Sequence, residues 1–221
     1  MAKSRSYKLL CPIARALDRI GDRWTLLILR DLHAGPARYS DLQKGLTGIA
    51  ANLLAERLAK LVEDGLVRKS ETGHGTSVYE LTELGQRTSD IIYELAIFGA
   101  RFQPEGPVIA PGNLRTVATT MGAAANRVAT PEMTFEAAVM VDGEHMRLTV
   151  NNGHATMRYT ESESPDLVFS TSYSDLLAVT EGELDFDTFA TRHSKLDVIS
   201  LGKETEFIAL MSRITALLQK E

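Results

Sequence analysis

The chain has 221 residues, of which 44% are hydrophobic and 24% are charged, and its formal net charge is −5. This balance is that of an ordinary globular protein and excludes intrinsic disorder over most of the length. The single cysteine, Cys11, excludes an internal disulfide and a multi-cysteine zinc site. No segment reaches the roughly 18 uncharged apolar residues of a membrane helix, and the first residues lack the pattern of a secretory signal, so we expect a cytoplasmic location.

Charge is divided unevenly along the chain. Residues 1–103 carry 15 lysines and arginines against 12 acidic residues, whereas residues 104–221 carry 9 against 17. The change of sign coincides with a proline- and glycine-rich segment, 104–112, that neither continues a helix nor alternates like a strand. We therefore predict two domains, 1–103 and 113–221, joined by this linker, with an anionic partner for the first domain only.

The first domain is predicted to begin with four helices. Pro12 suits the first position of a short helix, and Asp22 suits the cap of a second helix that stops before Gly35. A short third helix follows Ser40. A fourth covers about residues 50–64, with leucines at helical spacing.

A hairpin and one long helix are predicted to complete the first domain. Residues 66–70 and 77–81 read as two strands joined by a flexible tip at 73–75. Thr82 then caps a helix whose stripe positions recur at alternating steps of four and three, the rhythm of a helix–helix seam. The stripe consists of Leu84, Thr88, Ile91, Leu95, Phe98 and Phe102. The element order is that of a winged helix-turn-helix, mostly α with a two-stranded wing.

The second domain is predicted to be α+β, with a five-stranded, mostly antiparallel sheet and flanking helices. Apolar residues alternate at period two, and Asn152-Gly153 is a strong signal for a two-residue hairpin. The predicted strands lie at about 135–141, 146–150, 155–159, 167–171 and 195–200. The predicted helices lie at about 114–128, at 172–180 and from 207 to the end.

Motifs of one family run through the first domain. In chain order they are Cys11-Pro12, Ile20-Gly21-Asp22-Arg23-Trp24-Thr25-Leu26-Leu27-Ile28-Leu29-Arg30, Arg38-Tyr39-Ser40-Asp41-Leu42, Gly48-Ile49, Arg57-Leu58, Gly65-Leu66-Val67-Arg68 and Tyr79-Glu80-Leu81-Thr82-Glu83-Leu84-Gly85. Over about residues 8–102 the chain thus resembles the HxlR-type transcriptional regulators. The resemblance implies a dimeric, DNA-binding regulator whose fourth helix lies in the major groove. Ala50 stands where that family usually has a serine, so this helix lacks a hydroxyl cap.

The fourth helix offers the residues expected to meet DNA bases. Its leucines face inward, so Ala51, Asn52 and Ala55 face outward near its N-terminus, where such helices contact base edges. An asparagine can pair with adenine, and alanine methyls can touch thymine. Nearby cations are expected to hold phosphates, although surface charges of this kind can also be merely solvated. The predicted DNA-binding residues are Arg38, Ser40, Lys44, Ala51, Asn52, Ala55, Arg57, Arg68, Lys69 and His74. For Arg57, bracing the fold internally is an equal alternative.

Apolar residues on the first and last helices of this domain are expected to form a two-fold dimer, which would bind a pseudo-palindromic operator. They are Ile13, Leu17, Leu84, Ile91, Leu95, Phe98 and Phe102.

Cys11 precedes a helix N-terminus, a position that favours thiolate. In some HxlR-type regulators an N-terminal cysteine at this place senses oxidants or electrophiles. The alternative is a small, inert side chain. An enzyme is not expected, nor a cofactor or metal: the five histidines lack ligand spacing, and Asp185 and Asp187 fall in a predicted loop.

Residues 165–198 carry a second resemblance. The segments Pro165-Asp166-Leu167-Val168-Phe169-Ser170-Thr171, Ser174-Asp175-Leu176-Leu177-Ala178, Glu181-Gly182-Glu183-Leu184 and Lys195-Leu196-Asp197-Val198 are similar to sterol carrier protein type 2 domains, over about residues 113–219. That resemblance implies an apolar tunnel for a lipid-like ligand, whereas the residues alone equally fit a filled core. The candidate lining residues are Phe135, Val139, Met157, Phe169, Leu176, Leu177, Phe186, Phe189, Phe207 and Met211.

Three hypotheses follow. The first is a dimeric regulator of a double-stranded DNA operator, controlled by an apolar small molecule in the second domain, with no membrane partner. The second is a regulator that senses its signal at Cys11, with a purely structural second domain. The third, more distant, is a lipid or acyl carrier whose helical half binds proteins.

Overall fold

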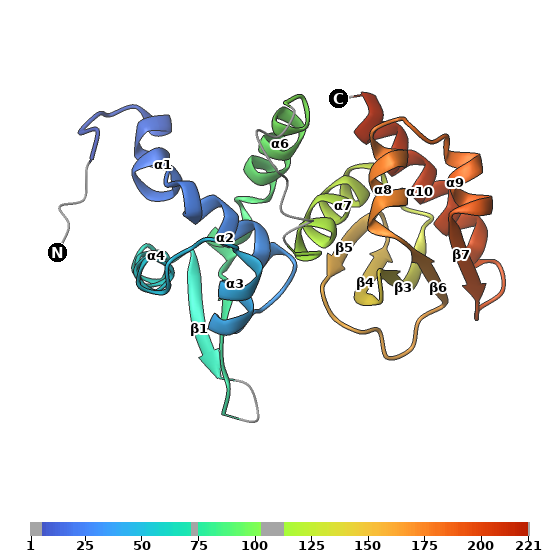
Figure 1. Cartoon of the computed structure of the whole chain (residues 1–221), viewed down its shortest axis with the longest axis horizontal. Coiled ribbons are helices and arrows are strands. Elements are labelled where there is room, and N and C mark those ends of the chain that lie inside the picture. The colour runs from blue at the N-terminus through green and yellow to red at the C-terminus, as the bar shows by residue number, and fades with distance from the viewer. Residues whose placement is uncertain (1–5, 72–74, 103–112, 221) are drawn as a thin grey trace. The chain divides into compact units, whose positions relative to one another are not determined.

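The computed structural model describes residues 6–71, 75–102 and 113–220, and divides into two compact units, Met1–Ile92 and Tyr93–Glu221 (Figure 1). The predicted linker, 104–112, lies outside the described residues. The boundary between the units falls inside a helix, so the residues after Ile92 that were assigned to the first domain belong to the second unit.

The first unit and its last helix follow the winged helix-turn-helix order. Its elements are α1 (Pro12–Ile20), α2 (Arg23–His33), α3 (Tyr39–Gly45), α4 (Ala51–Glu63), β1 (Val67–Glu71), β2 (Ser77–Leu81), α5 (Glu83–Gln86) and α6 (Ser89–Ala100). The four N-terminal helices and both strands lie within two residues of their predicted bounds.

Local chemistry explains these helices. Asp22 caps α2, because its side chain accepts a hydrogen bond from the Trp24 amide at 2.9 Å. The apolar faces of α2, α3 and α4 then meet in one core. Its least exposed members are Ile28, Leu29, Leu32, Leu42, Leu54, Leu58 and Leu61.

The predicted long helix from Thr82 to Phe102 is wrong, because the chain forms two helices, α5 and α6, that break at residues 87–88. Thr82 caps only the short α5, by accepting from the Gly85 amide at 3.1 Å. Buried Thr88 then donates to the Gly85 carbonyl at 2.7 Å and lies 2.9 Å from His33 Nε2. The break therefore leaves Leu84 on α5 and Phe102 beyond the end of α6.

The second unit has a five-stranded sheet with the order β5-β4-β3-β6-β7. Only the pair β3 and β6 is parallel. Its elements are α7 (Arg115–Val128), β3 (Thr134–Val141), β4 (Glu144–Asn151), β5 (His154–Arg158), β6 (Leu167–Thr171), α8 (Tyr173–Thr180), α9 (Phe186–Arg192), β7 (Ser194–Val198) and α10 (Lys203–Lys220).

The hairpin between β4 and β5 forms as predicted. Asn152 and Gly153 both have positive φ, 49° and 79°, the backbone of a type I′ turn. The loop predicted around Asp185 and Asp187 is wrong, because the Asp185 side chain accepts from the Thr188 amide at 2.8 Å and so caps α9.

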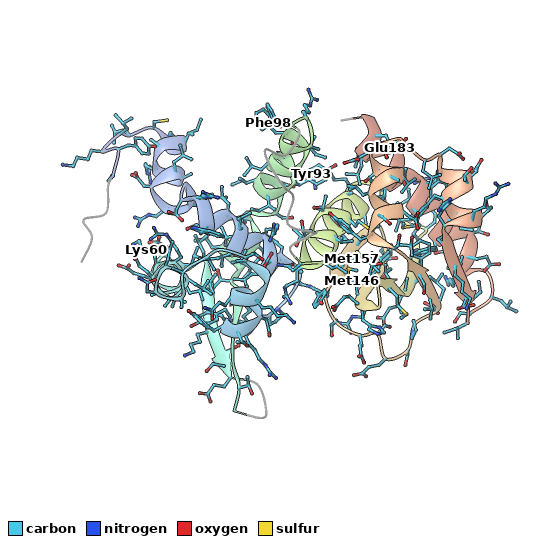
Figure 2. The ribbon with its side chains drawn as sticks, viewed as in Figure 1. Lys60, Tyr93, Phe98, Met146, Met157 and Glu183 are labelled. Carbon is cyan, nitrogen blue, oxygen red and sulfur yellow. The ribbon has the colours of Figure 1, made fainter. Side chains whose placement is uncertain are left out.

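One face of the sheet is buried by helices. Residues of β3 alternate between buried and half-buried, and α7 packs on β5 while α10 packs on β3. Met146 of β4 and Met157 of β5 belong to the buried face (Figure 2). The core of this unit therefore lies between the sheet and its helices.

Candidate DNA-binding surface

Helix α4 presents its outer face as predicted. Leu54, Leu58 and Leu61 are almost completely buried. Ala51, Asn52 and Ala55 are exposed. Within the described part of the chain, the Asn52 side-chain amide makes no hydrogen bond, so both of its polar groups are available to a base.

The predicted phosphate-binding cations differ in what they contact. Lys44, on α3, and Lys69, on β1, are exposed. Arg68 is also exposed, but its Nε donates to Glu80 Oε1 at 3.0 Å across the wing. That hydrogen bond raises the pKa of Arg68 and lowers the pKa of Glu80. His74 lies outside the described residues.

The N-terminus of α3 carries the other two polar residues expected here. Arg38 is the residue before the helix, and its amide donates to Asp41 Oδ2 at 3.1 Å. Arg38 and Ser40 both have exposed side chains.

Arg57 makes internal contacts of the kind that its alternative role, bracing the fold, requires. Its guanidinium lies 3.0 Å from both carboxylate oxygens of Asp22 and 2.8 Å from Glu56. This fork joins the middle of α4 to the cap of α2, and it occupies donors that a phosphate would need. Burial works to raise the pKa of Asp22, but hydrogen bonds from Arg57 and from the Trp24 amide outweigh it, so the pKa lies below its ordinary value.

A charge-removing variant tests this brace. Asp22→Asn keeps a capping oxygen but loses the ion pair, so at pH 7 it should be less stable than the wild type by up to about 1 kcal/mol. A lowered folded-state pKa adds stability above the unfolded pKa, and that stability disappears as pH falls through the folded value. The difference should therefore shrink below about pH 4. Urea unfolding followed by fluorescence of Trp24, the only tryptophan, measures it.

Glu63→Gln is the matched control for that variant. Glu63 pairs with Lys60 on the exposed side of α4, with 72% of its side chain accessible, so its loss should change stability little at any pH. Equal losses in the two variants, or a loss from Asp22→Asn that does not change with pH, would contradict the brace.

The residues expected at a dimer interface all have large apolar side chains, and all of them are exposed in the single chain. Ile91, Leu95 and Phe98 lie along α6, and the Phe98 ring packs against that of Phe102 with centroids 5.1 Å apart and planes tilted by 57°. The full set of exposed residues is Ile13, Leu17, Leu84, Ile91, Leu95, Phe98 and Phe102. Large exposed apolar side chains of this kind mark interaction surfaces.

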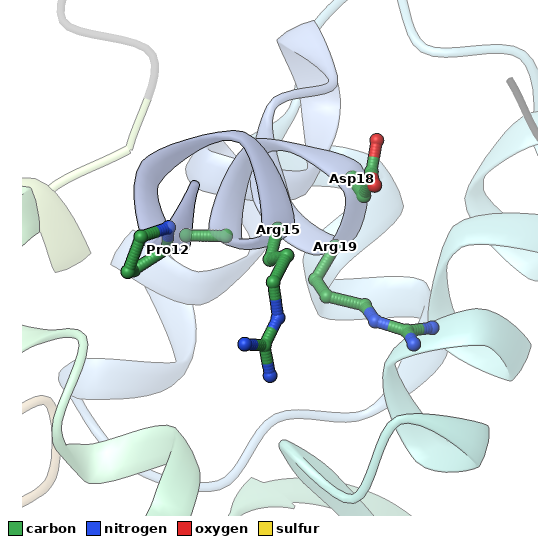
Figure 3. Close-up of a pocket in the computed structure, with 5 residues that line it drawn as sticks. Pro12, Arg15, Asp18 and Arg19 are labelled. Carbon is green, nitrogen blue, oxygen red and sulfur yellow. The ribbon is translucent and has the colours of Figure 1, made fainter. Parts of the chain in front are cut away.

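Cys11 is exposed and stands directly before α1. A shallow surface pocket lies along the same helix, lined by Pro12, Arg15, Ala16, Asp18 and Arg19 (Figure 3). The Arg19 guanidinium also binds Asp64 Oδ1 at 2.8 Å.

The candidate ligand-lining residues of the second unit contact one another. The ring of Phe207 lies 5.9 Å from Phe135 and 5.2 Å from Phe169, and Phe169 lies 6.1 Å from Phe189, measured between centroids. Val139, Met157, Leu176 and Met211 are buried as well, whereas Phe186 is half-buried and Leu177 is exposed on α8. These aromatic rings pack as a core does.

Neither a metal site nor a membrane span is found among the residues that the structure describes. No group of three or more histidine, cysteine, aspartate or glutamate side chains there could hold a metal ion. None of the helices described is long and apolar enough to cross a membrane.

Comparison with known proteins covers the first unit. The family described as HxlR-like helix-turn-helix matches residues 19–106. The helix-turn-helix-type transcriptional regulator YtfH of Escherichia coli is 33% identical over 88 residues, which are 39% of this chain and 70% of YtfH. The chain belongs to the HxlR-like family.

Other transcriptional regulators match a similar share of this chain. The regulator Rv3095 of Mycobacterium tuberculosis is 39% identical over 101 residues, or 44% of this chain, and the match spans only 63% of the length of Rv3095. The reduced form of the regulator YodB from Bacillus subtilis, a solved structure, is 27% identical, with a TM-score of 0.38; the match covers 45% of this chain and 100% of YodB. The family match ends at residue 106, so the likeness of residues 113–219 to sterol carrier protein type 2 stays a prediction.

Proposed function

We propose that this HxlR-like protein regulates transcription by binding an operator as a dimer, through α4 and the β1–β2 wing. The observation that carries the proposal is the outer face of α4. Its N-terminal half exposes Ala51, Asn52 and Ala55, while the leucines on its other side are fixed in the core. A helix whose outer face carries small side chains and one amide fits the major groove of DNA.

The roles of the surrounding side chains follow from their contacts. Asn52 is proposed to read a base. Lys44, Lys69 and Arg38 are proposed to hold phosphates, because their side chains are exposed around the helix-turn-helix and wing. Arg68 has to share its guanidinium with Glu80, and Arg57 is proposed to hold α4 in place rather than to contact DNA.

Base reading and phosphate binding are separable by mutation. Asn52→Ala should weaken binding to the operator by about 1–3 kcal/mol and leave binding to random DNA nearly unchanged. Lys69→Ala should weaken binding to both DNAs by a similar factor and lower the salt dependence. Fluorescence anisotropy with two labelled duplexes of equal length measures both effects. Equal losses on the two DNAs for Asn52→Ala would remove Asn52 as a base reader.

Two-fold assembly is proposed because α1 and α6 each carry large apolar side chains that are exposed in the single chain. A symmetric dimer carries two copies of α4, so its operator should be pseudo-palindromic with half-sites about one or two helical turns apart.

The thiol of Cys11 is a candidate sensor of electrophiles that would control the regulator. Its exposure at the start of α1 makes it accessible to small electrophiles. YodB of Bacillus subtilis, which is 29% identical over 104 residues, has also been solved in a quinone-bound form. A quinone is therefore the probe of choice, with Cys11→Ser as the control that should not respond.

Binding of the apolar effector proposed for the second unit would cost free energy. Most of its candidate lining residues are buried and in contact, so a ligand among them would have to displace packed rings such as Phe169 and Phe207. Thermal unfolding of the full chain with a panel of fatty acids decides between an effector-binding unit, which is stabilised, and a structural unit, which is not.

A further inference from the structure

The first turn of α4 has neither a side-chain cap nor a fully buried side chain among its first residues, the two features that usually order a helix end. Ala50, the residue before the helix, has no side-chain oxygen to cap it. Ala51 and Asn52 are exposed, and the first fully buried side chain is that of Leu54. A helix end of this kind leaves its leading amides unpaired and frays readily. The turn is nevertheless the one that carries Asn52.

Tyr39 provides the missing restraint from the neighbouring helix. Its hydroxyl donates a hydrogen bond to the Ala51 carbonyl, with 2.6 Å between the oxygens. Its ring is partly buried against the core of the first unit. Among the described residues, this is the one side-chain hydrogen bond made to the first turn of α4.

The position of Tyr39 is itself fixed on both sides. It is the first residue of α3, which opens on the hydrogen bond from the Arg38 amide to Asp41. Two residues before it, Ala37 pairs with Tyr79 of the wing through backbone hydrogen bonds of 3.0 and 2.8 Å. The hydroxyl therefore reaches Ala51 from a backbone that the wing and α3 hold in place.

We propose that Tyr39 is a positioning residue that determines DNA specificity: its hydroxyl, by donating to the Ala51 carbonyl, holds the first turn of α4 where Asn52 can read a base. This bond anchors the turn through a carbonyl and leaves the leading amides of the helix without a cap. This inference rests on the proposed function of α4 as the base-reading helix. Phosphate binding depends on exposed cations elsewhere, so the Tyr39 hydroxyl should affect discrimination between sequences and leave general affinity for DNA unchanged.

Tyr39→Phe tests the proposal, because it keeps the buried ring and removes only the hydroxyl. Affinity for the operator should fall roughly 2- to 10-fold, the effect of one lost hydrogen bond, while affinity for random DNA stays the same. Amide hydrogen exchange of Leu54 and Ala55, the first amides that can pair along the helix, should become faster, and exchange around Leu58 should not. The matched control is Tyr79→Phe, since Tyr79 packs on the same core and its hydroxyl makes no hydrogen bond among the described residues.

A rescue experiment separates positioning from a general loss of stability. Ala50→Ser supplies a capping hydroxyl to the same turn. In the Tyr39→Phe background it should restore operator affinity and slow exchange of the Leu54 and Ala55 amides, and in the wild type it should add little. An equal gain in both backgrounds would show that the two sites act independently and would overturn the proposal.

The two readouts also separate this inference from the proposed function. A wild-type chain that binds no DNA refutes the proposed function and with it the role in specificity. Exchange of the Leu54 and Ala55 amides that is unchanged by Tyr39→Phe refutes the restraint itself, whatever the DNA binding. Faster exchange together with an unchanged ratio of operator to random-DNA affinity refutes the role in specificity alone.

Discussion

Ile91→Glu is expected to convert the proposed dimer into monomers and to lower operator affinity by 100-fold or more. Ile91 lies on the apolar face of α6 and is 43% exposed in the single chain, so the substitution should leave the monomer folded. At a two-fold interface the substitution would bury two glutamates, one from each copy. Their like charges would lose water without gaining partners, which opposes association. In a dimer, binding of one α4 holds the other at high effective concentration near the second half-site, which raises affinity by about 10²- to 10⁴-fold. A monomer loses this gain.

Sedimentation velocity at micromolar concentration and anisotropy on the operator measure the two effects of Ile91→Glu. Leu201→Glu is the matched control, because Leu201 is a 94% exposed apolar residue just before α10 and no role at the dimer interface is proposed for it. The control should remain dimeric and bind DNA normally. An Ile91→Glu protein that stays dimeric with full operator affinity would remove α6 from the interface.

Gly85→Ala is expected to destabilise the first unit by about 2–4 kcal/mol, because the added methyl has no room. A Cβ at this position would stand 2.0 Å from the Leu66 carbonyl oxygen, a backbone atom that cannot rotate away. The same oxygen accepts the hydrogen bond from the Thr82 amide at 3.0 Å, so moving it would open the junction between the wing and α5. Urea unfolding followed by Trp24 fluorescence reports on the first unit, and circular dichroism of the same samples reports on the helices of both units, including α6.

The control for this variant is Gly99→Ala on α6. A Cβ there would meet nothing within 4 Å, and alanine favours a helix over glycine, so stability should stay the same or rise by up to about 1 kcal/mol. If Gly85→Ala were as stable as the wild type, the close contact between α5 and Leu66 would be contradicted.

The helices and wing of the first unit could be predicted because their signals are local. Asp22, Pro12 and the leucines of α4 act through caps and helical spacing, both of which are visible in the sequence. The outward position of Asn52 follows from the same spacing and is confirmed by its exposure.

The break between α5 and α6 could not be predicted, because the spacing of four and three continues across it. Thr88 occupies a stripe position, yet its side chain is buried. Its hydroxyl forms hydrogen bonds with the Gly85 carbonyl and His33 Nε2. That contact depends on where α2 ends in space. Helix α9 was missed for another reason: it has seven residues, and its cap, Asp185, looks like any solvated acid in the sequence.

Contacts between residues far apart in the sequence could not be predicted either. The pairing of Arg57 with Asp22 joins residues 35 positions apart, so the same arginine could equally have faced DNA. The packing of Phe135, Phe169 and Phe207 depends on how helices sit on a sheet, which an apolar pattern does not encode.

The most direct test of the account is the binding of the full chain to DNA from upstream of its own gene, compared with random DNA of equal length, over roughly 50–300 mM salt. The account predicts tighter binding to the upstream DNA, with a logarithm of affinity that falls linearly with the logarithm of salt on both DNAs. Two copies of the chain should bind each operator. Failure to bind either DNA, or equal affinity for both across the salt range, would contradict the claim that α4 reads a DNA sequence.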